Sequence, residues 1–438
     1  MSSPAKTASA NGVNGLLGKL LAWTDERFPL TATLKTHLSE YYAPKNFNFW
    51  YYFGSLAMLA LVLQIVTGIL LAMHYKPDAA LAFASVEYIM RDVPWGWMIR
   101  YMHSTGASMF FIVVYLHMMR GLMYGSYRKP RELLWIFGCL IYLCLMGEAF
   151  FGYLLPWGQM SFWGAQVIIN LFAAIPFIGE DLAILIRGDY NIGDATLNRF
   201  FAFHVIALPL ALLGLVAAHL VALHEVGSSN PDGIEIKENL DPETGTPKDG
   251  IPFHPYYTLK DIVGVVVFLM VFTVIVFFMP EMGGYFLEAN NFIPANPLLT
   301  PVHIAPLWYF TPFYAMLRAI PSVFGSQFPG VAVMGAAVMI LFFLPWLDRG
   351  TVKSIRYRGP KYKVWLTGFV ISFLVLGYLG VVPTTVWGQM PKIFPFDGIE
   401  VATLVARILT IVYFLFFILM PWYTRGDKEK PVPERLRW

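Results

Sequence analysis

Eight apolar segments recur along this chain of 438 residues, separated by polar connections. A helix needs about 20 mostly apolar residues to cross a bilayer, and each segment is close to that length. The pattern therefore predicts an all-α integral membrane protein with eight transmembrane helices. The predicted spans are residues 49–73, 97–123, 133–155, 200–223, 262–279, 330–346, 364–382 and 401–422.

Two long connections between the spans carry structural signals of their own. Residues 156–199 include an apolar stretch, 159–172, that is too short to span, so we expect helices lying in the membrane interface. Residues 280–329 are rich in Pro, Phe and Tyr, and their Asn-Pro, Thr-Pro and Ala-Pro steps favour a folded cap. We divide the chain into four parts. They are a cytoplasmic segment with a surface helix (1–48), a four-helix bundle (49–225), a C-terminal helical region with the cap (226–425) and a cytoplasmic tail (426–438).

Composition supports the membrane assignment and excludes other classes. Only 13% of the residues are charged, against about 25% in soluble domains. The net charge of +3 is too small to indicate a nucleic-acid partner. The N-terminus lacks a long apolar core, so we expect no cleaved signal peptide. Cys139 and Cys144 form neither a CxxC pair nor a CxxCH haem site, and we expect both to be packing residues.

Orientation follows from the basic residues in the short loops, which favour the cytoplasmic side. The second loop carries Arg128, Lys129 and Arg131, and the loop at 347–363 carries six basic residues. The opposite side holds only three in its short loops: Lys76, Arg91 and Lys392. Both termini are therefore predicted to be cytoplasmic. The second and fourth spans, separated by one span, run parallel.

Four histidines lie inside these two parallel spans, where a polar ring is costly and marks a functional candidate. His103 and His117 are 14 residues apart, about 21 Å along the helix and about 40° short of four turns. His204 and His219 are 15 apart, about 22 Å and about 60° past four turns. We therefore pair His103 with His204 near the outer side, and His117 with His219 near the cytoplasmic side.

Two imidazoles facing each other at one level suit the axial positions of haem iron, so the spacing predicts two haems. A proton relay or a metal-transport path would need acids near the histidines, and these two spans supply none. A polytopic transporter with structural histidines is the competing class of protein.

Glycines in the first and third spans repeat the 14-residue spacing. They leave room for a macrocycle edge at each histidine level, although small residues also allow membrane helices to pack closely. Arg100 and Arg120, one turn from His103 and His117, are candidate partners of haem propionates, and snorkelling to lipid headgroups is the alternative. The glycines are Gly54 with Gly68 and Gly138 with Gly152.

Several sequence runs resemble cytochrome b of the cytochrome bc1 complex (ubiquinol–cytochrome c reductase), bacterial type. The resemblance covers nearly all of residues 20–425 and favours the fused form over the split cytochrome b6 and subunit IV. The 15-residue histidine gap departs from the 14 that is usual and resembles the b6 type. The matching runs are QIVTG at 64–68, RYMH at 100–103, GYLLPWGQMSFWGA at 152–165, HEVGSSNP at 224–231 and FHPYYTLKD at 253–261.

This resemblance implies a redox function in a bacterial inner membrane. Quinol, here ubiquinol, would be oxidised at an outer site (Qo), with one electron passing to a Rieske iron–sulfur protein and cytochrome c1. The other would pass through an outer low-potential and an inner high-potential haem b to quinone at an inner site (Qi), generating proton motive force. Membrane lipid and a homodimeric complex are further implied partners. A di-haem anchor of a dehydrogenase is less favoured, because an anchor needs only the first four spans.

For the inner site, the resemblance indicates His224, Ser228, Lys260 and Asp261. An imidazole and a carboxylate facing each other can bind the two quinone oxygens and deliver protons. The alternative is that these are ordinary interface residues.

For the outer site, the family motif Pro-Glu-Trp-Tyr reads Pro-Leu-Trp-Tyr at 306–309, so Leu307 replaces the acid that takes a quinol proton. Glu148 in the third span is an unusual carboxylate at this depth, and our hypothesis is that it replaces the missing acid. A protonated Glu148 bonded to a backbone carbonyl is the alternative. The same pocket is predicted to contain Tyr153, Gly164 and Tyr309, with His303 as a candidate proton exit.

Overall fold

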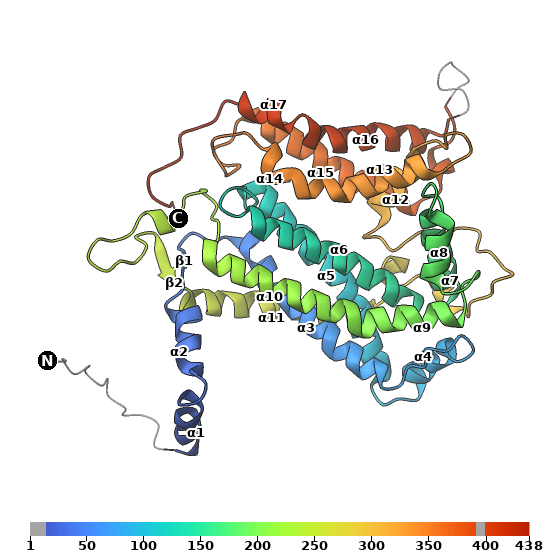
Figure 1. Cartoon of the computed structure of the whole chain (residues 1–438), viewed down its shortest axis with the longest axis horizontal. Coiled ribbons are helices and arrows are strands. Elements are labelled where there is room, and N and C mark those ends of the chain that lie inside the picture. The colour runs from blue at the N-terminus through green and yellow to red at the C-terminus, as the bar shows by residue number, and fades with distance from the viewer. Residues whose placement is uncertain (1–14, 391–398, 438) are drawn as a thin grey trace.

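A computed structural model describes residues 15–390 and 399–437 of the chain (Figure 1). Within these residues, eight helical segments are long and apolar enough to cross a membrane, which confirms the all-α membrane fold. Lys392, and the predicted N-terminal segment up to residue 14, lie outside the described residues. The eight segments are Phe49–Ala72, Gly96–Tyr124, Glu132–Leu154, Asp194–Val226, Phe253–Phe278, Phe328–Leu347, Pro360–Val381 and Val401–Ile418.

Three of the segments show how the helices differ from their predicted bounds. The fourth begins at Asp194 rather than 200, because polar residues of α9 (Asp194–Ala202) extend the helix beyond the apolar run. The fifth begins at Phe253 rather than 262, where a polar and aromatic turn precedes the apolar stretch. The eighth ends at Ile418, and a separate short helix, α17 (Met420–Arg425), follows it. Hydropathy detects only the apolar part of a helix, so polar helical ends are missed.

The N-terminal half forms a four-helix bundle in which α3 packs along α5 and α6 packs along α10. The fifth membrane helix, α11 (Thr258–Phe278), packs outside the bundle against α3 and α5. Figure 1 shows these helices running side by side through the middle of the molecule. The bundle helices are α3 (Tyr52–Ala72), α5 (Gly96–Tyr124), α6 (Glu132–Leu154) and α10 (Leu208–Val226).

The C-terminal helices form a second layer, drawn in orange and red in Figure 1. Its centre is the packing of α15 against α12 and α16. A continuous cluster of buried side chains joins this layer to α5 and α6. The layer consists of α12 (Thr311–Ala319), α13 (Phe328–Met339), α14 (Leu344–Leu347), α15 (Pro360–Val381), α16 (Val401–Ile418) and α17.

Short helices cover one end of the bundle, at the right of Figure 1. As expected for the connection at 156–199, its apolar stretch forms a helix too short to span, α7 (Gln159–Ala173), followed by α8 (Gly179–Arg187). The connection between α11 and α13 folds onto α7, where the Ile293 carbonyl accepts a hydrogen bond of 2.9 Å from the Gln159 amide. It is a folded cap rather than a linker. The other short helix at this end is α4 (Ala82–Arg91).

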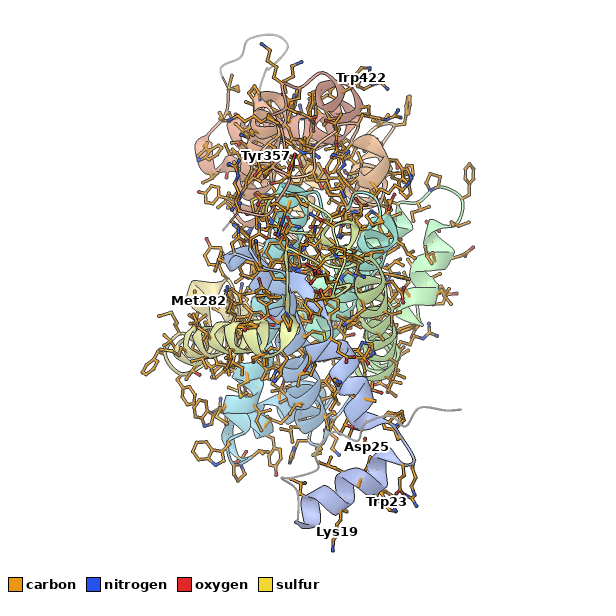
Figure 2. The ribbon with its side chains drawn as sticks, turned by 90° about the vertical axis from the view of Figure 1, so that its left-hand side faces the viewer. Lys19, Trp23, Asp25, Met282, Tyr357 and Trp422 are labelled. Carbon is orange, nitrogen blue, oxygen red and sulfur yellow. The ribbon has the colours of Figure 1, made fainter. Side chains whose placement is uncertain are left out.

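The opposite end gathers the basic loops and a two-stranded sheet. Strands β1 (Tyr42–Pro44) and β2 (Gly250–Pro252) pair antiparallel, with Tyr42 opposite Pro252. Arg128 donates to the carbonyl oxygens of Gly350 and Val352, so the two basic loops contact each other. Figure 2 shows α1 standing away from the bundle, with Trp23 exposed. The helices preceding β1 are α1 (Leu16–Asp25) and α2 (Leu30–Leu34).

Candidate functional site

The four membrane histidines meet in two pairs between α5 and the α9–α10 segment. The ring centres of His103 and His204 are 6.1 Å apart, and those of His117 and His219 are 6.4 Å apart. Two metal–nitrogen bonds of about 2.0–2.1 Å, plus about 1.1 Å from each nitrogen to its ring centre, span about 6.3 Å. Each pair is therefore spaced to hold one metal ion between its imidazoles.

A π-helical turn explains the 15-residue gap between His204 and His219. Residues Phe203–Ala207 form this turn (η3), whereas the 14 residues from His103 to His117 lie within one regular α-helix. A π-turn accommodates one extra residue in a helix. Pro209 follows the turn and has no N–H to bond the Val205 carbonyl, which loosens the α-helical pattern there. The extra residue is taken up before α10, so His219 still faces His117.

Each of the four predicted glycines faces one histidine. A Cβ atom placed on Gly68 would lie 3.2 Å from Cε1 of His103, and one on Gly152 would lie 2.4 Å from Cε1 of His204. We name the two levels outer and cytoplasmic after the sides predicted for them. At the cytoplasmic level, a Cβ on Gly54 would lie 3.4 Å from Cε1 of His117, and one on Gly138 would lie 3.5 Å from Cε1 of His219. The glycines therefore leave space around both pairs.

Hydrogen bonds orient the outer pair. His103 Nδ1 lies 2.9 Å from Oγ1 of Thr67, which itself donates to the Leu63 carbonyl at 2.6 Å. His204 Nδ1 donates to the Glu148 carbonyl at 2.9 Å. A metal-binding histidine commonly uses its second nitrogen in this way, which fixes the ring and leaves Nε2 for the metal.

Arg120 lies beside the cytoplasmic pair. Its Nη2 is 3.4 Å from His117 Nδ1, and its Nη1 donates to Ser126 Oγ at 3.1 Å. Its Nε is buried without a hydrogen-bond partner, as expected of a guanidinium that has room for an anionic group. Arg100 lies one turn before His103 in α5, in the corresponding position at the outer level. Arg120 therefore fits the predicted role of a propionate partner, and for Arg100 this role stays a prediction.

No cluster of three or more His, Cys, Asp or Glu side chains that could hold a metal ion occurs in the described part of the chain. Each histidine pair would therefore supply two ligands to a metal ion, and a cofactor could supply the others. Haem provides four equatorial nitrogens and leaves two axial positions, so the donor set fits it.

Comparison with known families gives the same assignment. A family model described as cytochrome b/b6/petB matches residues 38–227, and one described as cytochrome b(C-terminal)/b6/petD matches residues 294–414. The chain belongs to the cytochrome b family. Membership implies haem b binding, in agreement with the two histidine pairs.

Relatives share nearly the full length of this cytochrome b. Cytochrome b of Allochromatium vinosum is 66% identical over 420 residues, covering 95% of this chain and 98% of that protein. Cytochrome b of Rhodospirillum rubrum is 48% identical over 419 residues, covering 95% of each. A solved structure described as a hyperthermophilic respiratory complex III matches with a TM-score of 0.81 and 38% identity, over 93% of this chain and 100% of that one.

A cavity of about 480 Å³ joins the cytoplasmic histidine pair to the predicted inner quinone residues. It is large enough for a small-molecule site. His224 donates from Nδ1 to the Leu220 carbonyl at 2.9 Å, which leaves Nε2 for a ligand. The structure thus brings the predicted inner-site residues into one cavity with the cytoplasmic pair: His224, Ser228, Lys260 and Asp261 with His117 and His219.

Two further residues of this cavity were missed from the sequence. His37 and Tyr41, from the segment before β1, pack their rings 5.1 Å and 4.7 Å from the ring of His224. The Tyr41 hydroxyl lies 3.4 Å from Ser228 Oγ. Because this segment is separated from His224 by more than 180 residues, only its polar and aromatic composition was a signal.

Three of the predicted outer-site residues lie where the cap meets α6 and α7, namely Tyr153, Gly164 and Tyr309. A Cβ on Gly164 would lie 3.5 Å from the Tyr153 ring. Tyr309 is buried and stacks on Phe111 with ring centres 3.9 Å apart, and Leu307 is buried in the same cluster. His303 is exposed and donates from Nε2 to the Val381 carbonyl at 2.7 Å, so it lies at the surface of the cap.

Glu148 has a partner that the sequence did not predict. Its Oε1 lies 3.0 Å from His204 Nδ1, and its Oε2 is buried with no hydrogen-bond partner. The carboxylate therefore contacts a predicted haem ligand. Its role as the outer-site acid remains a prediction.

Proposed function

We propose that this cytochrome b is the quinol-oxidising subunit of a bc1-type quinol–cytochrome c reductase. The observation that carries the proposal is the pair of histidine levels, each spaced for one metal ion and separated by four helical turns, about 21 Å, along α5. When bound, the two haems would supply the one-electron relay between an outer and an inner quinone site. Moving one charge across the membrane against 100 mV requires about 2.3 kcal/mol, which quinol oxidation would have to supply.

The chain's own residues define the two ends of this reaction. At the inner site, His224 and Asp261 line the cavity beside the cytoplasmic pair and would deliver protons to quinone. At the outer site, Tyr153, Gly164 and Tyr309 would form the wall of a quinol pocket. The chain carries no Cys-rich iron–sulfur motif, so a Rieske protein and cytochrome c1 are the proposed acceptors. The inner bacterial membrane and a homodimeric complex complete the proposal.

The histidine pairing can be tested by counting haems in the complex purified from its own membranes. We expect two b-type components in a reduced-minus-oxidised spectrum of the wild type. His103→Leu and His204→Leu should each remove the same component, and His117→Leu and His219→Leu the other, because each haem needs both ligands.

The exposed His303 provides a matched control, since His303→Leu should retain both components. One haem per chain in the wild type, or loss of different components within a pair, would contradict the proposal.

A further inference from the structure

A carboxylate of the cap reaches the outer quinone site. Glu288 immediately precedes the short helix η7 (Ala289–Phe292) in the connection between α11 and α13. Its Oε2 accepts a hydrogen bond of 2.6 Å from the hydroxyl of Tyr153, near the end of α6. Glu288 is half-buried, whereas the residues after it, Ala289 and Asn290, are exposed. The carboxylate therefore lies between the interior and the outer surface.

Just beyond this contact, the cap is fixed against the start of α7 and the residue Trp157 before it. Asn291 Oδ1 accepts from the Ser161 amide at 2.9 Å, and the Ile293 carbonyl accepts from the Gln159 amide at 2.9 Å. The Ala295 amide in turn donates to the Trp157 carbonyl at 3.0 Å. These bonds hold the backbone just beyond Glu288, so its side chain is aimed at Tyr153 by a rigid support rather than by a free loop.

Glu288 also interacts with Tyr309 of the motif at 306–309, in which Leu307 replaces the family's glutamate. Tyr309, two residues after Leu307, is buried, and its pKa is raised first by burial and then by the charge of Glu288. Tyr153 follows Gly152, whose missing side chain makes room for His204. The carboxylate is thus linked to two residues of the predicted quinol pocket, Tyr153 and Tyr309.

We propose that Glu288 accepts a proton from quinol at the outer site, with Tyr153 as its positioning residue; this rests on the function proposed above. A quinol O–H bond breaks, the proton bonds to a carboxylate oxygen of Glu288, and the electron pair stays on the quinol oxygen. Two one-electron acceptors, an iron–sulfur partner and a haem b, would then oxidise the quinolate to quinone, and the second quinol proton would be released to water. The proton leaves Glu288 for water through the exposed side of the cap.

The surroundings of Glu288 suit a base that works near neutral pH. Burial raises its pKa to about 7, although the hydrogen bond from Tyr153 acts in the opposite direction. A general base is most effective when its pKa lies close to the working pH. Among the described residues, Tyr153 of α6 and Tyr309 of the cap are the titratable groups that interact with it.

The test measures quinol oxidation by the intact complex as a function of pH. In the wild type, the rate should rise through about pH 7 as Glu288 loses its proton. Glu288→Gln keeps the size of the side chain but cannot accept the proton, so we expect the rate to fall about 100-fold or more and the rise to disappear. Glu281→Gln, an exposed glutamate of the same connection, is the matched control and should match the wild type.

A second variant keeps the proposal testable if Glu288→Gln assembles poorly. Tyr153→Phe removes the hydroxyl that lowers the pKa of Glu288, so the rise should move to higher pH while the haem spectrum stays unchanged. An unshifted pH profile would overturn the role of Tyr153 as the positioning residue.

The outcomes separate this inference from the proposed function. If the wild type binds two haems and oxidises quinol but Glu288→Gln keeps the full rate and the same profile, only the role of Glu288 is wrong. If Glu148→Gln rather than Glu288→Gln removes the rise, Glu148 is the acid and the inference is overturned. A wild-type complex that does not oxidise quinol would instead contradict the proposed function.

Discussion

Gly152 and Gly138 show how much a single hydrogen in place of a side chain matters at the two levels. A Cβ on Gly152 would lie 2.4 Å from Cε1 of His204, closer than atoms approach, whereas a Cβ on Gly138 would lie 3.5 Å from Cε1 of His219, an ordinary contact. The imidazole ring of His204 would have to move to make room for a methyl group at residue 152. A displaced ligand cannot keep its bond to iron.

We therefore expect Gly152→Ala to lose most of the outer haem and Gly138→Ala to keep the inner one. Overpacking of this kind costs about 1–3 kcal/mol, enough to lower occupancy severely. The measurement is the haem-to-protein ratio of the purified complex, with the two components resolved by redox titration. Equal losses in the two variants would contradict this interpretation of the contacts.

The π-turn at Phe203–Ala207 lies between the two histidines of its helix and includes the first of them, His204. It allows His204 and His219, which are 15 residues apart, to face His103 and His117, which are 14 residues apart on α5. Ile206 within the turn is 58% exposed, as expected for a side chain facing lipid. Removing it should therefore cost little packing.

Deleting Ile206 together with Pro209→Ala should give a regular helix with a 14-residue gap that still binds both haems. Inserting one alanine after Gly214, where an added Cβ would meet no neighbouring side chain within 4 Å, should instead turn His219 by about 100° and abolish the inner haem. Reduced-minus-oxidised spectra of the two variants would show which haems each variant retains. Loss of a haem in the deletion variant would show that the turn is needed for more than spacing.

Contacts at the end predicted to be cytoplasmic join the two helical layers of the molecule. Asp348, which follows α14, pairs with the buried Arg358 and accepts a hydrogen bond of 2.7 Å from the Tyr127 hydroxyl. Burial alone would raise the pKa of Asp348, but Arg358 and Arg128 hold it below its ordinary value. The stabilisation is therefore fully present above about pH 4 and is lost as the pH falls through the lowered pKa.

Asp348→Asn should lower the thermal stability of the haem-loaded complex, because it leaves Arg358 buried without its charge partner. Breaking such a buried pair costs about 3–5 kcal/mol. The partly exposed Asp241 offers a control, because Asn can still accept the two backbone hydrogen bonds that Asp241 accepts, and Asp241→Asn should change stability by less than about 0.5 kcal/mol. Equal melting temperatures of the two variants in detergent would refute a stabilising role for this buried pair.

The sequence alone determined the eight spans and the two histidine levels, because span length and helical rise are local properties of a chain. Loop charge and helix parity then indicated which histidines share a level, and the glycine spacing repeated the pattern. The predicted helix boundaries were wrong where polar residues extend a helix, as at Asp194.

Only the tertiary structure decided which distant side chains complete the sites. The contact between Glu288 and Tyr153 joins residues 135 apart, and His37 reaches His224 from before the first span. No periodicity encodes such contacts, because they depend on how a folded cap and a terminal segment pack against the finished bundle. The same packing placed Glu148 against His204, which depth in the membrane alone could not reveal.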